Sequence, residues 1–179
     1  MLKKLPKVNE IISVYAVISF MAYGWTLVAF IWKLPSWLHY LTAGEILGIY
    51  SYSLLTDFVE SLIFLALTLF LCAILPARLM LDAFIMRGTI FAISLMGTIM
   101  FVLSVYTDTN TALMESVPAW LVILVSTCLW TALLELLCRK VPAAASSLLG
   151  LADRLMIFLY INLPLSFFAL IVVASRNLR

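Results

Sequence analysis

Five long apolar stretches restrict the folds open to this sequence more than any other feature. They are Ile11–Trp32, Leu54–Leu75, Gly88–Tyr106, Ala119–Cys138 and Leu155–Ala174. A helix needs about 20 apolar residues to cross the hydrocarbon core of a bilayer, and the runs are continuous, without the alternation that marks barrel strands. Of 179 residues, 65% are hydrophobic and 11% charged, against roughly 25% charged in soluble domains. The sequence predicts an all-α integral membrane protein, one polytopic domain over residues 1–179 with about five transmembrane helices.

The first apolar run follows Lys3, Lys4 and Lys7 and so has the charge pattern of a secretory signal. The run is longer than a signal core, contains Tyr and Trp, and lacks a small-residue cleavage site. We therefore expect it to be retained as a span.

Basic residues in the short connections predict the orientation, because cytoplasmic loops carry an excess of Lys and Arg. One side of a five-span arrangement would hold Lys3, Lys4, Lys7, Arg78, Arg87, Arg139, Lys140 and Arg154, and the other Lys33, Arg176 and Arg179. We expect a multi-pass protein of the cell membrane with the N-terminus in the cytoplasm and the C-terminus outside.

The connection over residues 33–53 is too apolar for a solvated loop, yet Pro35, Gly44 and Gly48 interrupt it and Glu45 charges it. Its aromatic side chains are of the kind that settle at headgroup level. We expect an interfacial or re-entrant segment after the first helix; a sixth span here would remove the charge bias on which the predicted orientation depends. Residues 142–154, with a run of Ala and Ser, are expected to form a cytoplasmic connector.

Asp57 and Glu60 are the principal candidates for a functional site, because an ionisable group within a span costs about 2.5–3.5 kcal/mol on insertion scales. Their spacing separates them by roughly 60° around a helix, on one face. One hypothesis is that both face the bundle interior and bind a cation, a proton or a basic partner group. The alternative is that the helix begins close to Asp57, which then lies at the interface, while Glu60 pairs with a neighbouring helix.

Two further polar groups favour structural roles. Glu135 lies one turn before Arg139, a spacing typical of an ion pair on one helix face. Asn162 and Pro164 interrupt the fifth run. Pro164 is expected to kink the helix, and Asn162 to bind a neighbouring helix or line a substrate path.

Metal and cofactor motifs are absent from the sequence. His39 is the only histidine, so the chain cannot supply a bis-histidine haem site. Cys72, Cys128 and Cys138 show no CxxC spacing, and we expect free thiols and no metal. No cofactor is indicated.

The functional prediction rests on the small size of the parts outside the apolar runs. The sequence contains no GxSxG, HExxH or phosphate-binding glycine loop, so we do not expect an enzyme. A net charge of +2 without a basic run argues against nucleic acid. We expect an accessory, assembly or scaffolding subunit that binds lipids, other membrane subunits or itself. The alternative is a small proton or cation carrier, or transporter component, that uses Asp57 and Glu60.

Overall fold

The protein is described from a computed structural model that covers residues 5–106 and 117–178. In these ranges it is helical, and five helices are long and apolar enough to cross a membrane. They are α1 (Val8–Trp37), α2 (Ala43–Ile74), α4 (Phe84–Tyr106), α5 (Val117–Lys140) and α6 (Pro142–Asn177), with the short α3 (Ala77–Met80) and the 3₁₀ turn η2 (Leu81–Ala83) between α2 and α4. The predicted helical class and the five apolar helices are confirmed, and they indicate a membrane location.

Helix α1 is the centre of the assembly, because it packs against α2, α4 and α6. Val14 and Ile18 of α1 are fully buried and belong to one apolar cluster with Phe84 of α4. Gly88 of α4 allows a close approach to α1, since a Cβ there would lie 3.1 Å from a methyl group of Val14. Small residues permit this kind of contact between membrane helices.

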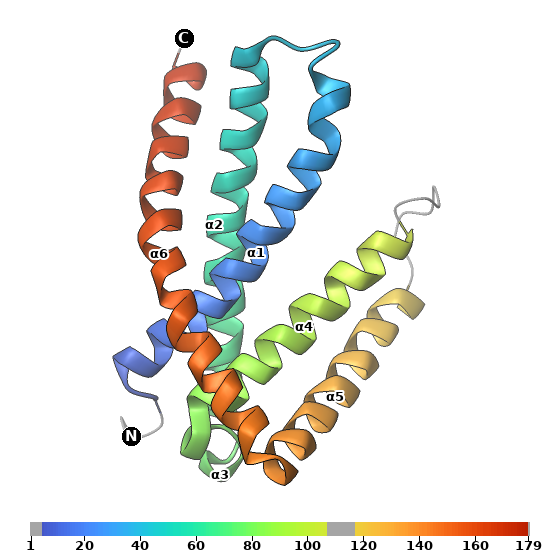
Figure 1. Ribbon diagram of the computed structural model, residues 1–179, viewed down its shortest axis with the longest axis vertical. Helices are drawn as coiled ribbons and strands as arrows, with labels where there is room; N and C mark the ends of the chain where they lie inside the picture. Colours follow the sequence, from blue (N-terminus) through green and yellow to red (C-terminus); the bar gives the residue numbers. More distant parts are fainter. Residues whose placement is uncertain (1–4, 107–116, 179) are drawn as a thin grey trace.

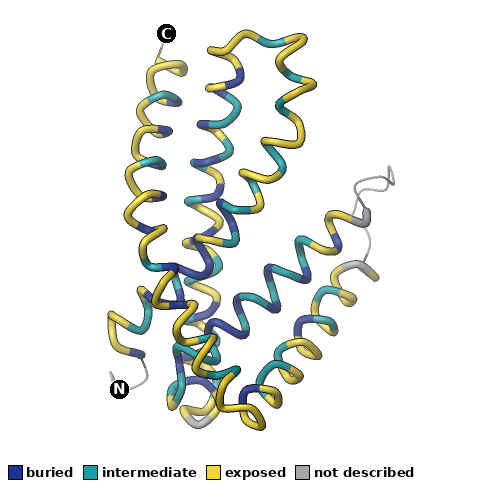
Figure 2. Tube along the Cα trace, viewed as in Figure 1, coloured by how far each residue is buried: buried dark blue, intermediate teal, exposed yellow. Residues whose placement is uncertain are grey.

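The helices form two groups in Figure 1. Helices α1, α2 and α6 run together toward the end marked C, whereas α4 and α5 form a hairpin that leans away from them. Helix α5 has the smallest buried share of the five, 11%, and Figure 2 shows it largely exposed. Its outer surface is therefore available to lipid or to another helix.

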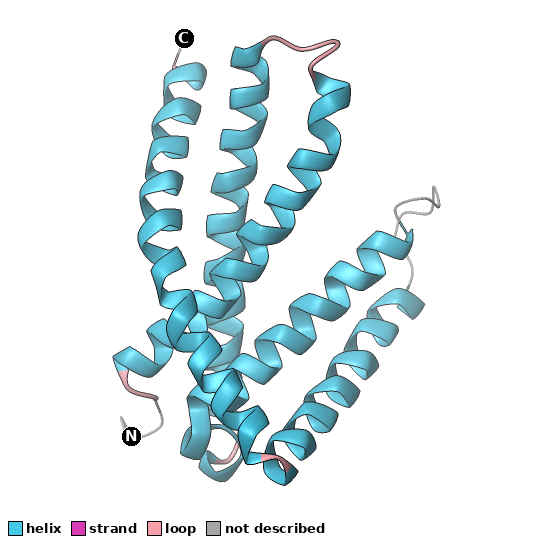
Figure 3. Ribbon diagram, in the orientation of Figure 1, coloured by secondary structure: helices cyan, strands magenta, loops and turns pink. Residues whose placement is uncertain are grey.

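No separate helix occupies residues 33–53 in the structure, and the expected interfacial or re-entrant segment is not confirmed. Helix α1 continues to Trp37 and α2 already begins at Ala43, so only a short loop joins them (Figure 3). The early start of α2 has a local cause, a capping box. Glu45 Oε2 accepts hydrogen bonds from the backbone nitrogen of Thr42 at 2.8 Å and from its hydroxyl at 2.7 Å, while the Thr42 hydroxyl accepts from the Glu45 nitrogen at 3.4 Å.

Helix α6 also begins earlier than expected, at Pro142. The predicted connector over 142–154 is wrong, because proline is favourable at the first helical position and the following Ala residues are strong helix formers. The ribbon of α6 changes direction partway along its length (Figure 1). Pro164 lies inside this helix and cannot donate a backbone hydrogen bond, which gives the bend a physical cause.

The start of α2 is joined to the end of α6. Arg176 Nη1 donates a hydrogen bond to the carbonyl oxygen of Gly44 at 3.3 Å, and Tyr52 donates from its hydroxyl to Asn177 Oδ1 at 3.0 Å. A Cβ at Gly48 would overlap the guanidinium of Arg176. The glycine therefore gives this arginine room to lie against the backbone of α2.

Candidate functional site

Asp57 lies near the middle of α2, about 21 Å from its first residue and about 26 Å from its last at roughly 1.5 Å rise per residue. Its side chain is only 5% exposed. The alternative in which α2 begins close to Asp57 is wrong, because the capping box starts the helix at Ala43. A helix dipole at an N-terminus therefore cannot account for this carboxylate, since that effect fades within the first turn.

The two oxygens of Asp57 differ in their surroundings. Oδ1 accepts a hydrogen bond of 2.7 Å from the hydroxyl of Thr26, on α1. Oδ2 is buried and accepts no hydrogen bond from the part of the chain that the structure describes. Leaving a buried acceptor without a donor costs about 1–3 kcal/mol, and more when the group is charged. The fold thus buries a hydrogen-bond acceptor, Oδ2 of Asp57, without supplying a donor for it from the described residues.

A cleft of about 320 Å³ lies beside Asp57, between α1, α2 and α4. Its lining is mainly apolar, with oxygen atoms from the side chains of Thr26, Asp57 and Glu60 and the indole N–H of Trp25. The lining residues are Ala22, Trp25 and Thr26 of α1, Asp57, Glu60, Ile63 and Phe64 of α2, and Met96, Ile99, Met100 and Leu103 of α4. The cleft therefore combines one buried carboxylate with a surface suited to an apolar group.

Glu60 lines the same cleft, but its side chain is exposed. Trp25 and Ile63, also in the lining, are exposed as well. These residues therefore form the rim, whereas Asp57 lies at the buried end. The structure brings the two predicted carboxylates to one cleft and gives them different positions in it.

Asn162 is placed elsewhere, on the contact between α1 and α6. Its Nδ2 donates to the hydroxyl of Ser19 at 3.1 Å. One turn later, Ser166 donates to the Asn162 backbone oxygen at 2.8 Å and also hydrogen-bonds the hydroxyl of Tyr23. Asn162 is buried and does not line the Asp57 cleft, so its observed contacts are those of a helix-packing residue.

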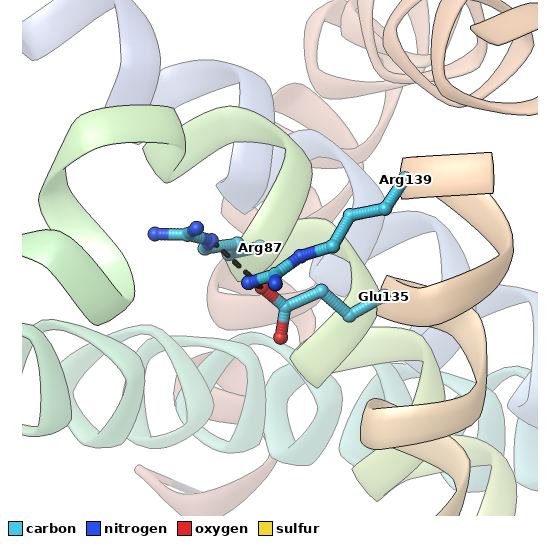
Figure 4. Close-up of polar contacts among 3 residues, drawn as sticks. All are labelled: Arg87, Glu135 and Arg139. Atoms are coloured by element: carbon cyan, nitrogen blue, oxygen red, sulfur yellow. Dashed lines mark hydrogen bonds and ion pairs between the residues drawn. The ribbon is translucent and has the colours of Figure 1, made fainter.

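Glu135 joins two helices. Its Oε1 lies 2.8 Å from Arg139 Nη2 on its own helix, and 3.2 Å from Arg87 Nε on α4. Figure 4 shows both guanidinium groups converging on this one carboxylate. Sequence spacing indicated the pair within α5, whereas the contact with Arg87 depends on how α4 packs against α5. Glu135, Arg87 and Arg139 thus connect the beginning of α4 to the end of α5.

Two features of the cleft, the contact of Thr26 with Asp57 and the methionines of α4, could not be predicted from the sequence. Thr26 is one of several hydroxyl residues in the apolar runs, and nothing local pairs it with Asp57. The methionines of α4 reach the cleft only because α4 packs on α1. Among the described residues, no three His, Cys, Asp or Glu side chains gather as a metal site would require.

Comparisons with models of protein families, with curated proteins and with solved structures found no match to this chain.

Proposed function

We propose that this protein binds a cation at Asp57 and acts as a small cation carrier or as a component of a transporter. The observation that carries the proposal is the buried Oδ2 of Asp57, which has no hydrogen-bond donor among the described residues and lies beside a cleft. A carboxylate is costly at the middle of a membrane helix, and such groups are typical of substrate and ion paths. A bound cation would supply the missing partner.

Glu60 supports the same function from the rim of the cleft. A second negative charge near the opening raises the local concentration of cations and favours their entry. The two carboxylates would then act in sequence, with Glu60 at the exposed edge and Asp57 at the buried end.

The test uses the purified chain in proteoliposomes adsorbed on a solid-supported membrane. The concentration of K⁺, Na⁺, H⁺, methylammonium or 2-phenylethylammonium is raised in a single step. At least one of these cations should give a transient current with the wild-type protein. That current should be lost in Asp57→Asn and reduced in Glu60→Gln. Asp153→Asn makes the same chemical change on an exposed carboxylate of α6 and should retain it. Equal currents in Asp57→Asn and wild type for every cation would refute the carrier.

A second candidate function is that of an accessory or scaffolding subunit, favoured by a groove of about 670 Å³ between α4 and α5. Ser94, Gly97 and Ser126 line it, and small residues let a partner helix approach closely. Purification in mild detergent should then retain a second membrane protein or a self-associated form. A monodisperse single chain would count against this function.

The orientation with the N-terminus in the cytoplasm is part of the proposal. It is supported by the arrangement in Figure 1, where the start of α1, α3 and the turn between α5 and α6 lie at one end of the assembly and the end of α6 lies at the other. Arg139 and Lys140 belong to the basic end, which is typical of a cytoplasmic side. A tag placed after Arg179 should be reachable from outside intact cells, and a tag reachable only from the cytoplasm would reverse the assignment.

A further inference from the structure

The chemistry of the Asp57 cleft narrows the class of cation. We infer that its ligand is an organic ammonium, a primary or secondary amine in its charged form with a compact apolar body, and this inference rests on the proposed function. Three observations carry it: the single unsatisfied oxygen at the buried end, the apolar lining, and the position of the opening.

The buried end of the cleft suits an N–H donor better than a bare metal ion. Oδ1 of Asp57 is occupied by Thr26, and Oδ2 is the acceptor left without a donor among the described residues. Ions such as Ca²⁺ take about six or more oxygen ligands, whereas the side chains of the described lining residues offer only the carboxylates of Asp57 and Glu60 and one hydroxyl. A charged amine needs a single carboxylate, to which its N–H gives a charge-assisted hydrogen bond.

The rest of the lining suits the apolar body of such a molecule. Phe64, Met96 and Met100 border the cleft, and methionine adapts its shape to aromatic and aliphatic groups. Trp25 adds an indole ring, the side chain that attracts cations most strongly through its π face. A volume of about 320 Å³ lies at the small end of the range for small-molecule pockets, roughly 300–1,000 Å³.

The opening of the cleft favours a ligand that dissolves in lipid. The exposed rim residues Glu60 and Ile63 follow Asp57 closely on α2, so the opening lies near the middle of a helix that crosses the bilayer. At that depth a hydrated inorganic ion pays a larger desolvation cost than an ammonium whose apolar body stays in contact with lipid. An amphipathic amine partitions into the membrane through its apolar body and can enter from the side.

The test separates charge from apolar body with four probes and the wild-type protein in lipid nanodiscs. 2-Phenylethylammonium has a charged amine and an apolar body, whereas methylammonium has the charged amine with almost no apolar body. 2-Phenylethanol has the same apolar body without a charge, and K⁺ is an inorganic cation. Calorimetry should show 2-phenylethylammonium binding at least tenfold more tightly than each of the others. Asp57→Asn should weaken that binding at least tenfold, and Asp153→Asn should leave it unchanged. Phe64→Ala should weaken binding of 2-phenylethylammonium without changing that of methylammonium.

A rim variant tests the same cleft without altering Asp57. Ile63 is exposed and lines the opening, so Ile63→Trp should narrow the cleft and weaken 2-phenylethylammonium binding at least fivefold. Ile74→Trp changes an exposed residue of the same helix outside the lining and should have no effect. Equal binding in the two tryptophan variants would overturn the inference.

The outcomes distinguish this inference from the function on which it rests. If K⁺ or methylammonium binds as tightly as 2-phenylethylammonium and Asp57→Asn removes that binding, the organic ligand is wrong and the cation site stands. If 2-phenylethanol binds equally well, the charge requirement is wrong. If no cation binds in a manner that depends on Asp57, both proposals fail.

Discussion

Thr26 donates a hydrogen bond of 2.7 Å to Oδ1 of Asp57 and thereby joins α1 to the middle of α2. The bond fixes one oxygen of the carboxylate and leaves Oδ2 without a donor among the described residues. Thr26 is therefore a positioning residue for the cleft. It holds the carboxyl group in one orientation, so that a ligand need not order it on binding.

Replacing Thr26 by valine should destabilise the protein, because valine keeps the shape of the side chain while the hydrogen bond to Oδ1 of Asp57 is lost. A buried acceptor left without its donor costs about 1–3 kcal/mol of unfolding free energy. SDS titration followed by circular dichroism measures this loss. Thr26→Ser retains the hydroxyl and should stay close to the wild type. A valine variant as stable as the wild type would show that the bond to Asp57 does not contribute, and a larger loss in the serine variant would assign the effect to the methyl group.

Replacing Asp57 by leucine should leave the unfolding free energy unchanged or raise it, while cation binding is lost. The substitution removes a buried polar group whose Oδ2 is unsatisfied, and apolar replacements of such groups are often neutral or stabilising. Thr26 can turn its hydroxyl to a carbonyl of its own helix. A marked loss of stability in the same SDS titration would identify Asp57 as a structural residue.

The contact of Asn162 with Ser19 should show measurable coupling between α1 and α6. The Nδ2 to Oγ distance is 3.1 Å and both residues are buried. Hydrogen bonds between membrane helices contribute on average about 0.6 kcal/mol and at most about 1.7 kcal/mol. A double-mutant cycle of Asn162→Ala and Ser19→Ala should give a coupling energy in that range. Simple additivity would contradict the observed contact.

Neutralising Glu135 should cost more stability than neutralising Arg139. Glu135 pairs with both Arg87 and Arg139, whereas Arg139 is well exposed and makes a pair of one-turn spacing on its own helix. Exposed pairs of that kind contribute about 0.3–0.5 kcal/mol. Thermal unfolding should give a lower melting temperature for Glu135→Gln than for Arg139→Gln, since only the Glu135 substitution weakens the contact between α4 and α5. Equal melting temperatures of the two variants would show that the contact between Glu135 and Arg87 does not stabilise the protein.

Two glycines of α4 should respond differently to alanine. A Cβ at Gly88 would lie 3.1 and 3.3 Å from the methyl groups of Val14, which is fully buried and would have to shift, whereas a Cβ at Gly97 would meet nothing within 4 Å. Gly88→Ala should therefore lower the melting temperature, and Gly97→Ala should leave it unchanged or raise it through helix propensity. The reverse order would disprove the close packing of α1 and α4.

Several local features of the fold can be predicted from the sequence. Thr42 and Glu45 have the spacing of a capping box, the signal that would have placed the start of α2 correctly. Pro142 likewise has the position favoured at a helix start. Pro35 and Gly44 do not interrupt the helices, because Pro35 lies inside the last turn of α1 and Gly44 inside the first turn of α2.

The sequence alone determined that five apolar helices form, because length and hydrophobicity are local properties that set the cost of exposing a backbone to lipid. It also determined that Asp57 would be costly. Only the tertiary structure decided that Asp57 is buried against Thr26, that Glu60 lies at the rim, and that Asn162 belongs to another contact. The physical reason is that these helices are apolar on nearly every side. Their composition therefore does not encode which face turns inward, and that choice is made by close packing and by a few hydrogen bonds between helices.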